Sequence, residues 1–349
     1  MRMIFTVLFL AAPLLLGCGL LIKKKGASQL FCFGVLFVLS ALFRYDYFFG
    51  TYPWVADYPL QLPGAVVNPA FYYITKLLSM VVPDYRIATV LWSFAVSVGI
   101  VLLINKNSSH PALSAVTAVI SGMWFISFKD PCLFMAILIT AFSFRYAGEK
   151  RFVRFLAHIL LASCFKLEFL LFIPLYLIFI TKPTLIHIPV LAVMAGLLIF
   201  FDISPAFAFI GSPSTERTGA ELFYPVTIAA TAIITAAAAK ITLRRNPHNA
   251  VMLTVMGVSA ALAMGSVADA RLLSLAVACF FPAAVTLVPE TILAAKSILA
   301  LTFKERKKPF IIAGAALLSV LGLAYYLVIV FRPETAMGFE TWIGMRNIY

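Results

Sequence analysis

The sequence has few charged residues. Asp, Glu, Lys and Arg make up 12% of the 349 residues, whereas hydrophobic residues make up 63%. A soluble domain has about 25% charged and ~45–50% apolar residues. The single core of a soluble protein of this length is too small to hide so much apolar surface. The composition therefore excludes a water-soluble globular domain, and lipid must cover the remaining apolar surface.

The sequence also lacks the patterns of a metal or redox centre. None of the five cysteines belongs to a C-x-x-C pair, and the four histidines do not have the spacing of metal ligands. The cysteines lie inside apolar runs, which is typical of small buried hydrophobic residues. The sequence implies no metal site and no cofactor.

About twelve apolar segments follow one another, separated by charges, proline and glycine. They are residues 3–22, 27–43, 86–104, 111–128, 131–146, 152–165, 167–181, 184–202, 224–243, 250–268, 272–289 and 309–331. A membrane span needs about 20 apolar residues. We therefore predict an all-α, polytopic integral membrane protein with about twelve transmembrane helices in a single domain, 1–349. The short segments 131–146, 152–165 and 167–181 are expected to tilt, kink or be partly re-entrant. Segment 3–22 precedes a basic cluster, which favours a retained helix over a cleaved signal peptide.

The distribution of Lys and Arg predicts the orientation, because cytoplasmic loops are enriched in both. If the helices alternate in direction, most basic residues fall on one side. These are the basic residues at 23–25, 106, 145–154, 182, 240–245 and 296–308. We assign this side to the cytoplasm, which places both termini on the periplasmic or extracellular side. The net charge of +13 then reflects topology and anionic lipid headgroups, and it needs no nucleic-acid partner.

Two loops are expected on the outer face, 44–85 and 203–223. Within the first loop, residues 66–82 have the pattern of a short helix that lies in the membrane interface or dips into the membrane. On the cytoplasmic side we expect a longer connection, 290–308, containing an amphipathic helix at 291–303. The working side of the protein is therefore predicted to be the outer one.

Four segments each bring a pair of opposite charges to this outer face. The pairs are Arg44 with Asp46, Lys129 with Asp130, Lys166 with Glu168, and Asp269 with Arg271. A charge at the centre of a membrane helix costs about 2.5–3.5 kcal/mol on insertion scales, so such residues usually face a cavity or a partner. Any single pair is equally well explained as an interfacial salt bridge with snorkelling side chains. The four pairs together favour a convergent site.

The loop 44–85 is dense in aromatic residues. Tyr and Trp favour membrane interfaces, which is one explanation of their number. The other is a sugar-binding groove, in which flat rings stack on pyranose faces and Asp57 and Asn68 bond the hydroxyl groups. The candidates for sugar stacking are Tyr52, Trp54, Tyr58 and Tyr72.

Cations, carboxylates and aromatic rings at the outer face of a membrane suit glycosyl transfer from a polyprenyl-pyrophosphate donor. Arg or Lys would bind the pyrophosphate and stabilise the charge that develops on this leaving group. A carboxylate would accept the proton of the attacking sugar hydroxyl. Many transporters carry the same residue types, so composition alone does not distinguish the two functions.

Short motifs along most of the chain resemble the EpsG/Wzy-type polysaccharide polymerases. They are FRYDY at 43–47, VNPAFYYITKL at 67–77, DYR at 84–86, WFISFKD at 124–130, LASCFK at 161–166 and ADAR at 268–271. The chain departs from the family at Lys129-Asp130, where Arg-Gln is common, and at Lys166, where His is common. Basic character survives at both positions, but the departures leave open which carboxylate acts as base.

The resemblance implies a glycosyltransferase of the bacterial inner (cytoplasmic) membrane. It would polymerise undecaprenyl-pyrophosphate-linked oligosaccharide units into O-antigen of lipopolysaccharide, capsule or exopolysaccharide, with a chain-length regulator as a possible partner. The implied pyrophosphate and glycan clamp consists of Arg44, Lys129, Lys166 and Arg271. The implied base is one of Asp46, Asp57 and Glu168. The alternatives are an O-antigen ligase, another glycosyltransferase of lipid-linked sugars, and a flippase or secondary transporter.

Overall fold

The protein is all-helical, and the part of the chain that the structure describes contains no strand. The computed structural model describes residues 11–47, 69–82, 84–108, 110–180, 219–242, 247–267, 269 and 271–305, with a few positions between 191 and 197. Within these residues, four helices are long and apolar enough to cross a membrane. The predicted segment 309–331 and most of 184–202 and of the loop 203–223 lie outside the described residues.

Most of the described helices overlap predicted apolar segments. They are η1 (Cys18–Leu21), α2 (Lys25–Tyr47), α4 (Pro69–Val81), α5 (Tyr85–Asn107), α6 (Pro111–Ile120), α7 (Met123–Lys129), α8 (Pro131–Gly148), α9 (Phe152–Ser163), η2 (Leu167–Leu171), α10 (Phe172–Phe179), α12 (Gly219–Thr242), α13 (Pro247–Gly265) and α14 (Arg271–Glu305). The four candidate spans lie in α2, α5, α8 and α14. In the other apolar helices, the apolar stretches are shorter, such as Ile228–Lys240 in α12 and Asn249–Gly265 in α13.

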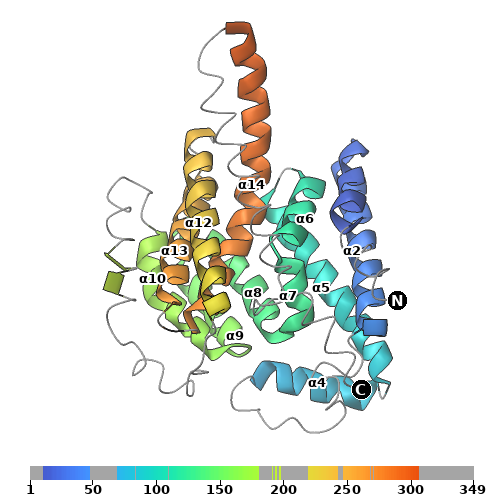
Figure 1. Ribbon diagram of the computed structural model, residues 1–349. Coiled ribbons are helices and arrows are strands. Elements are labelled where there is room, and N and C mark those ends of the chain that lie inside the picture. Colours follow the sequence, from blue (N-terminus) through green and yellow to red (C-terminus); the bar gives the residue numbers. More distant parts are fainter. Residues whose placement is uncertain are drawn as a thin grey trace.

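Helix α14 is the central element of the bundle. It lies between α12 and α13 on one side and α5, α6 and α8 on the other (Figure 1). Its part Leu272–Ala294 is almost entirely buried within the protein. Small residues allow this close packing, as in other membrane bundles. The hydroxyl of Ser259 in α13 donates a 2.8 Å hydrogen bond to the carbonyl of Ala276 in α14.

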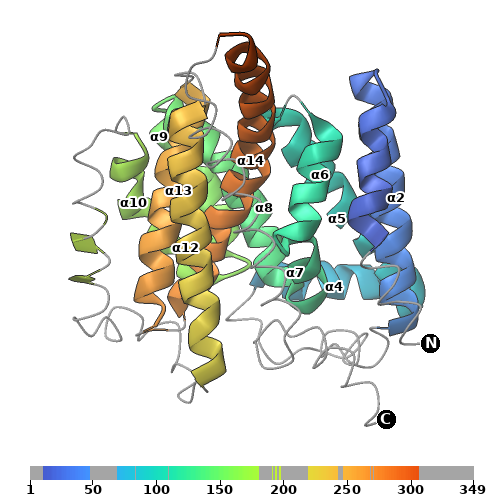
Figure 2. The same cartoon turned by 45° about the horizontal axis from the view of Figure 1, so that its top comes forward.

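Helix α4 has a different direction from the rest of the bundle. It lies across one end of the bundle, roughly perpendicular to the long helices (Figures 1 and 2). It falls within 66–82, where the sequence predicts a short helix. Its Phe71 is buried and packs edge-to-face on Trp92 of α5, with the ring centroids 5.7 Å apart.

Two predicted boundaries differ from the structure. The segment 111–128 forms two helices, because Gly122 between them has a φ of 88°, a left-handed conformation that glycine adopts readily. Conversely, the predicted boundary at Pro289 is not a helix end, since α14 continues through 291–303 to Glu305. Neighbouring helices satisfy the backbone groups that proline leaves free, so proline is tolerated inside membrane helices.

The long helices give the bundle two chemically different ends. At one end the Lys25 ammonium donates a 3.2 Å hydrogen bond to the carbonyl of Ser108, and the Lys106 ammonium lies 4.8 Å from the ring centroid of Phe142. The start of α2, the end of α5 and the end of α8 therefore meet here, and we call this the Lys25 end. The sequence predicts that these basic segments share one side, and the structure brings them to one end.

The other end contains the start of α8, the end of α9 and the start of α14, and we call it the Lys166 end. Helix α8 has 18 residues, so at 1.5 Å per residue it separates the two ends by about 27 Å. The hydrocarbon core of a bilayer is about 30 Å thick. The two ends are therefore spaced to lie at the two interfaces of one membrane.

Candidate functional site

The centre of the candidate site is an ion pair at the Lys166 end. The Nζ atom of Lys166, in the turn after α9, lies 2.9 Å from Oδ2 of Asp130, just before α8. The Lys166 side chain is 24% exposed and that of Asp130 is 34% exposed. The sequence predicts one pair of Lys129 with Asp130 and another of Lys166 with Glu168. In the structure, Asp130 pairs with Lys166 instead.

Local chain geometry fixes the position of Asp130. It is the N-cap of α8, and its Oδ1 accepts a 2.8 Å hydrogen bond from the backbone N–H of Leu133. Pro131, at the first helical position, has the fixed φ that a helix start requires. Both carboxylate oxygens of Asp130 therefore have a partner, because Oδ2 contacts Lys166.

Glu168 lies in η2, two residues beyond Lys166. Its Oε1 accepts a 2.7 Å hydrogen bond from the hydroxyl of Ser274 in the first turns of α14. Among the side chains that the structure describes, no other hydrogen-bond donor contacts this carboxylate. Glu168 is partly buried.

The charges around Lys166 favour its ammonium form. Lys166 lies between the predicted segments 152–165 and 167–181. Burial works against the charged form, but the carboxylates of Asp130 and Glu168 outweigh burial and raise the pKa of Lys166. The residue is therefore a cation at neutral pH, held between two carboxylates from different segments.

The start of α14 brings a further carboxylate to the same end. Asp269 is 5% exposed, and its backbone carbonyl accepts a 3.1 Å hydrogen bond from the backbone N–H of Leu272. It precedes Arg271, the first residue of α14. The segment Asp269–Arg271 and the Glu168–Ser274 contact therefore belong to the same end of the bundle.

Helix α4 adjoins this cluster. The N–H of Ala70, at the start of α4, donates a 3.0 Å hydrogen bond to the carbonyl of Cys164, two residues before Lys166. One face of α4 exposes large apolar side chains at helical spacing. They are Tyr73, Ile74, Leu77, Met80 and Val81. An amphipathic helix with such a face is suited to the membrane interface.

The structure brings together part of the predicted site. Lys166 and Glu168 lie beside each other with Asp130. Five other predicted residues lie on described helices, but their side chains are outside the described residues; they are Arg44 and Asp46 in α2, Tyr72 in α4, Lys129 in α7 and Arg271 in α14. The remaining four predicted residues lie outside the described residues altogether; they are Tyr52, Trp54, Asp57 and Tyr58.

Sequence reasoning missed Ser274 as a member of the site. It follows Arg271 by three residues, so both lie on the same face at the start of an apolar helix. The signal available in the sequence was that Ser274 is a polar residue one turn after the charged start of this apolar helix.

The cluster is suited to two tasks. A lysine held in place by one carboxylate attracts an anionic group such as a phosphate. A second carboxylate, oriented by a hydroxyl, can accept a proton. Among the described residues, no group of three or more His, Cys, Asp and Glu residues is placed to hold a metal ion.

No protein-family model, no curated protein and no solved structure matches the chain.

Proposed function

We propose that the protein is a glycosyltransferase that polymerises undecaprenyl-pyrophosphate-linked oligosaccharide units at the outer face of the bacterial inner membrane. One observation carries this proposal. Lys166 is held as a cation by Asp130, and the nearby Glu168 is oriented by the hydroxyl of Ser274. A cation and a carboxylate that are positioned separately are what transfer from a pyrophosphate donor requires.

The proposed membrane arrangement has about twelve spans with both termini outside. The Lys25 end would face the cytoplasm, because cytoplasmic segments are enriched in Lys and Arg. The Lys166 end, with α4 across it, would face the periplasm. The exposed apolar face of α4 would rest among lipid chains at the outer interface, next to the polyprenyl tail of the substrate.

In the proposed reaction, a hydroxyl of the acceptor sugar attacks the anomeric carbon of the donor glycan. A new glycosidic C–O bond forms, and the C–O bond between the anomeric carbon and the pyrophosphate breaks. Glu168 accepts the hydroxyl proton, and undecaprenyl pyrophosphate leaves with the bonding electron pair. Lys166 stabilises the charge that develops on this leaving group.

Of the three candidate bases, we propose Glu168, because its carboxylate lies near Lys166 and is oriented by the hydroxyl of Ser274. We propose that Arg44, Lys129 and Arg271 complete the clamp and that the aromatic residues of 44–85 bind the glycan. A chain-length regulator would be the protein partner.

A purified reaction tests the proposal. The full-length protein in lipid nanodiscs would be given a lipid-linked repeat unit, and the products would be resolved on a gel. Polymerisation predicts a ladder of products that differ by one unit. Transfer of single units to a different lipid acceptor, without a ladder, would instead indicate a ligase, and unchanged substrate would contradict the proposal.

A further inference from the structure

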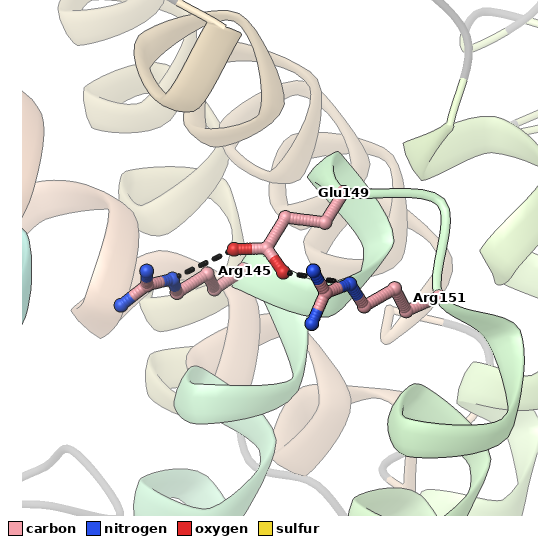
Figure 3. A network of polar contacts seen from close by, with 3 residues as sticks. All are labelled: Arg145, Glu149 and Arg151. Atoms are coloured by element: carbon pink, nitrogen blue, oxygen red, sulfur yellow. Dashed lines mark hydrogen bonds and ion pairs between the residues drawn. The ribbon is translucent and has the colours of Figure 1, made fainter.

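A carboxylate between two arginines lies at the Lys25 end, at the turn from α8 to α9. The Nε atom of Arg145 is 3.0 Å from Oε1 of Glu149, and the Nε atom of Arg151 is 3.3 Å from Oε2 (Figure 3). Each guanidinium therefore uses its Nε for this bridge. Among the described residues, no acceptor contacts the terminal Nη donors of Arg145 or Arg151. Both side chains are more than half exposed.

The surroundings of this bridge are strongly basic. Lys150 lies between the bridged residues, and the Arg154 guanidinium lies 5.9 Å from the ring centroid of Tyr146. Glu149 is the one acidic residue within 145–154. The hydrogen bond from Arg145 is the main reason why the pKa of Glu149 is lowered, and the charges of Arg151 and Arg154 add to it. The turn keeps an excess of positive charge at the level of a membrane interface.

An exposed apolar stripe begins directly beside these arginines. On α9, Val153 is 77% exposed, Leu160 is 47% exposed and Leu161 is 52% exposed. The opposite face of the same helix is buried, with Phe155 and Ile159 fully covered. Residues 153–161 rise about 12 Å along a helix, which approaches the ~15 Å of hydrocarbon in one leaflet of a ~30 Å core.

We propose that the α8–α9 turn binds one anionic phospholipid, with its phosphate on the terminal Nη donors of Arg145 and Arg151 and its acyl chains along Val153–Leu161. Planar guanidinium groups bind phosphate oxygens through paired N–H donors. Glu149 positions both guanidinium groups through their Nε atoms, and their Nη donors would bind the phosphate. The site is separate from the Lys166 end and does not depend on the proposed transfer reaction.

Lipid-dependent stability tests this site in the full-length protein. Thermal unfolding would be followed in a neutral detergent while phosphatidylglycerol, phosphatidylcholine or inorganic phosphate is added. We expect phosphatidylglycerol to raise the unfolding temperature and the other two to have little effect. Equal stabilisation by phosphatidylcholine would contradict a site for an anionic lipid. Equal stabilisation by inorganic phosphate alone would show that the site binds the free anion, and it would contradict a phospholipid as the ligand.

Variants separate a specific site from general charge attraction. A basic residue near the membrane surface contributes about 1 kcal/mol to binding anionic lipid, so Arg145→Gln with Arg151→Gln should weaken phosphatidylglycerol binding about tenfold to thirtyfold. The matched control is Lys23→Gln with Lys24→Gln, which removes two exposed positive charges at the same end but outside the bridge. An equal loss in this control would overturn the proposal.

The apolar stripe has its own test. Val153→Ser with Leu160→Ser should weaken binding of a long-chain phosphatidylglycerol and leave binding of a water-soluble short-chain analogue unchanged. Both residues are exposed, so these changes leave the core intact. Equal binding of the long-chain lipid by this variant and the wild type would contradict the placement of the acyl chains along α9.

Discussion

The ammonium of Lys166 and the carboxylate of Asp130 lie 2.9 Å apart, and this ion pair joins the turn after α9 to the start of α8. The pair can serve the fold, the reaction or both, and a charge exchange distinguishes these roles. Lys166→Asp combined with Asp130→Lys keeps an ion pair between the same two segments. Either change alone places two like charges at this contact, which costs more than the about 1–3 kcal/mol of a buried group left without its partner.

We expect each single variant to lower the unfolding temperature and the exchanged pair to regain part of the loss, because Asp130→Lys also removes the N-cap of α8. Glycosyl transfer should stay lost in the exchanged pair, because the cation no longer lies beside Glu168. Unfolding temperatures and product ladders of the four proteins check this prediction. An exchanged pair that polymerises at the wild-type rate would show that Lys166 is structural.

The Ser274 hydroxyl is expected to act as a positioning group for Glu168. A hydrogen bond to a charged group contributes about 1.5–3 kcal/mol, so Ser274→Ala should lower kcat about tenfold or more. KM should change little, because the clamp on the pyrophosphate remains. Ser274→Thr keeps the hydroxyl and should restore most of the rate, and an equally impaired Thr variant would argue against the hydrogen bond as the cause.

The break between α6 and α7 depends on the conformation of Gly122. A side chain at its φ of 88° costs about 1–2 kcal/mol, so Gly122→Ala should lower the unfolding temperature. Gly34 is a matched control, because it lies inside α2 and a Cβ added there meets nothing within 4 Å. Gly34→Ala should be neutral or stabilising. Equal unfolding temperatures for the two variants would contradict the left-handed conformation.

The bridge at Glu149 predicts a pH dependence. Its pKa is lowered in the folded protein by Arg145 first, then Arg151 and Arg154. The bridge therefore contributes fully to stability at pH values above the usual pKa of Glu. This contribution is lost as the pH falls through the lowered pKa of Glu149. The difference in Tm between the wild type and Glu149→Gln should stay constant down to about pH 5, just above the usual Glu range of ~4.3. A difference that vanishes between neutral pH and about pH 5 would contradict the lowered pKa.

Much of the fold could be predicted because lipid imposes strict rules on sequence. Apolar runs gave the helical character and the approximate positions of α2, α5, α8 and α14. Positions of basic residues predicted which helix ends share a side, and Lys25, Lys106 and Arg145 do lie at one end. The split at Gly122 was missed, because an isolated glycine in an apolar run does not reveal its φ angle.

The candidate site was predicted less well than the fold. Neighbours in sequence were expected to pair, such as Lys166 with Glu168. In the structure Asp130 contacts Lys166 and Ser274 contacts Glu168, and both contacts join residues far apart in the chain. Such contacts depend on how α8, α9 and α14 pack, and this information is not contained in the spacing within any one segment.

The most direct test of the proposed function is deletion of the gene in its source bacterium, with the surface glycan resolved on a gel. The deletion strain would be complemented with the wild type, Lys166→Met or Glu168→Gln, with expression of each protein verified by blot. We predict that the ladder of long chains collapses to a single repeat unit in the deletion strain, and that the wild type alone restores it. An unchanged ladder in the deletion strain would contradict the proposed function.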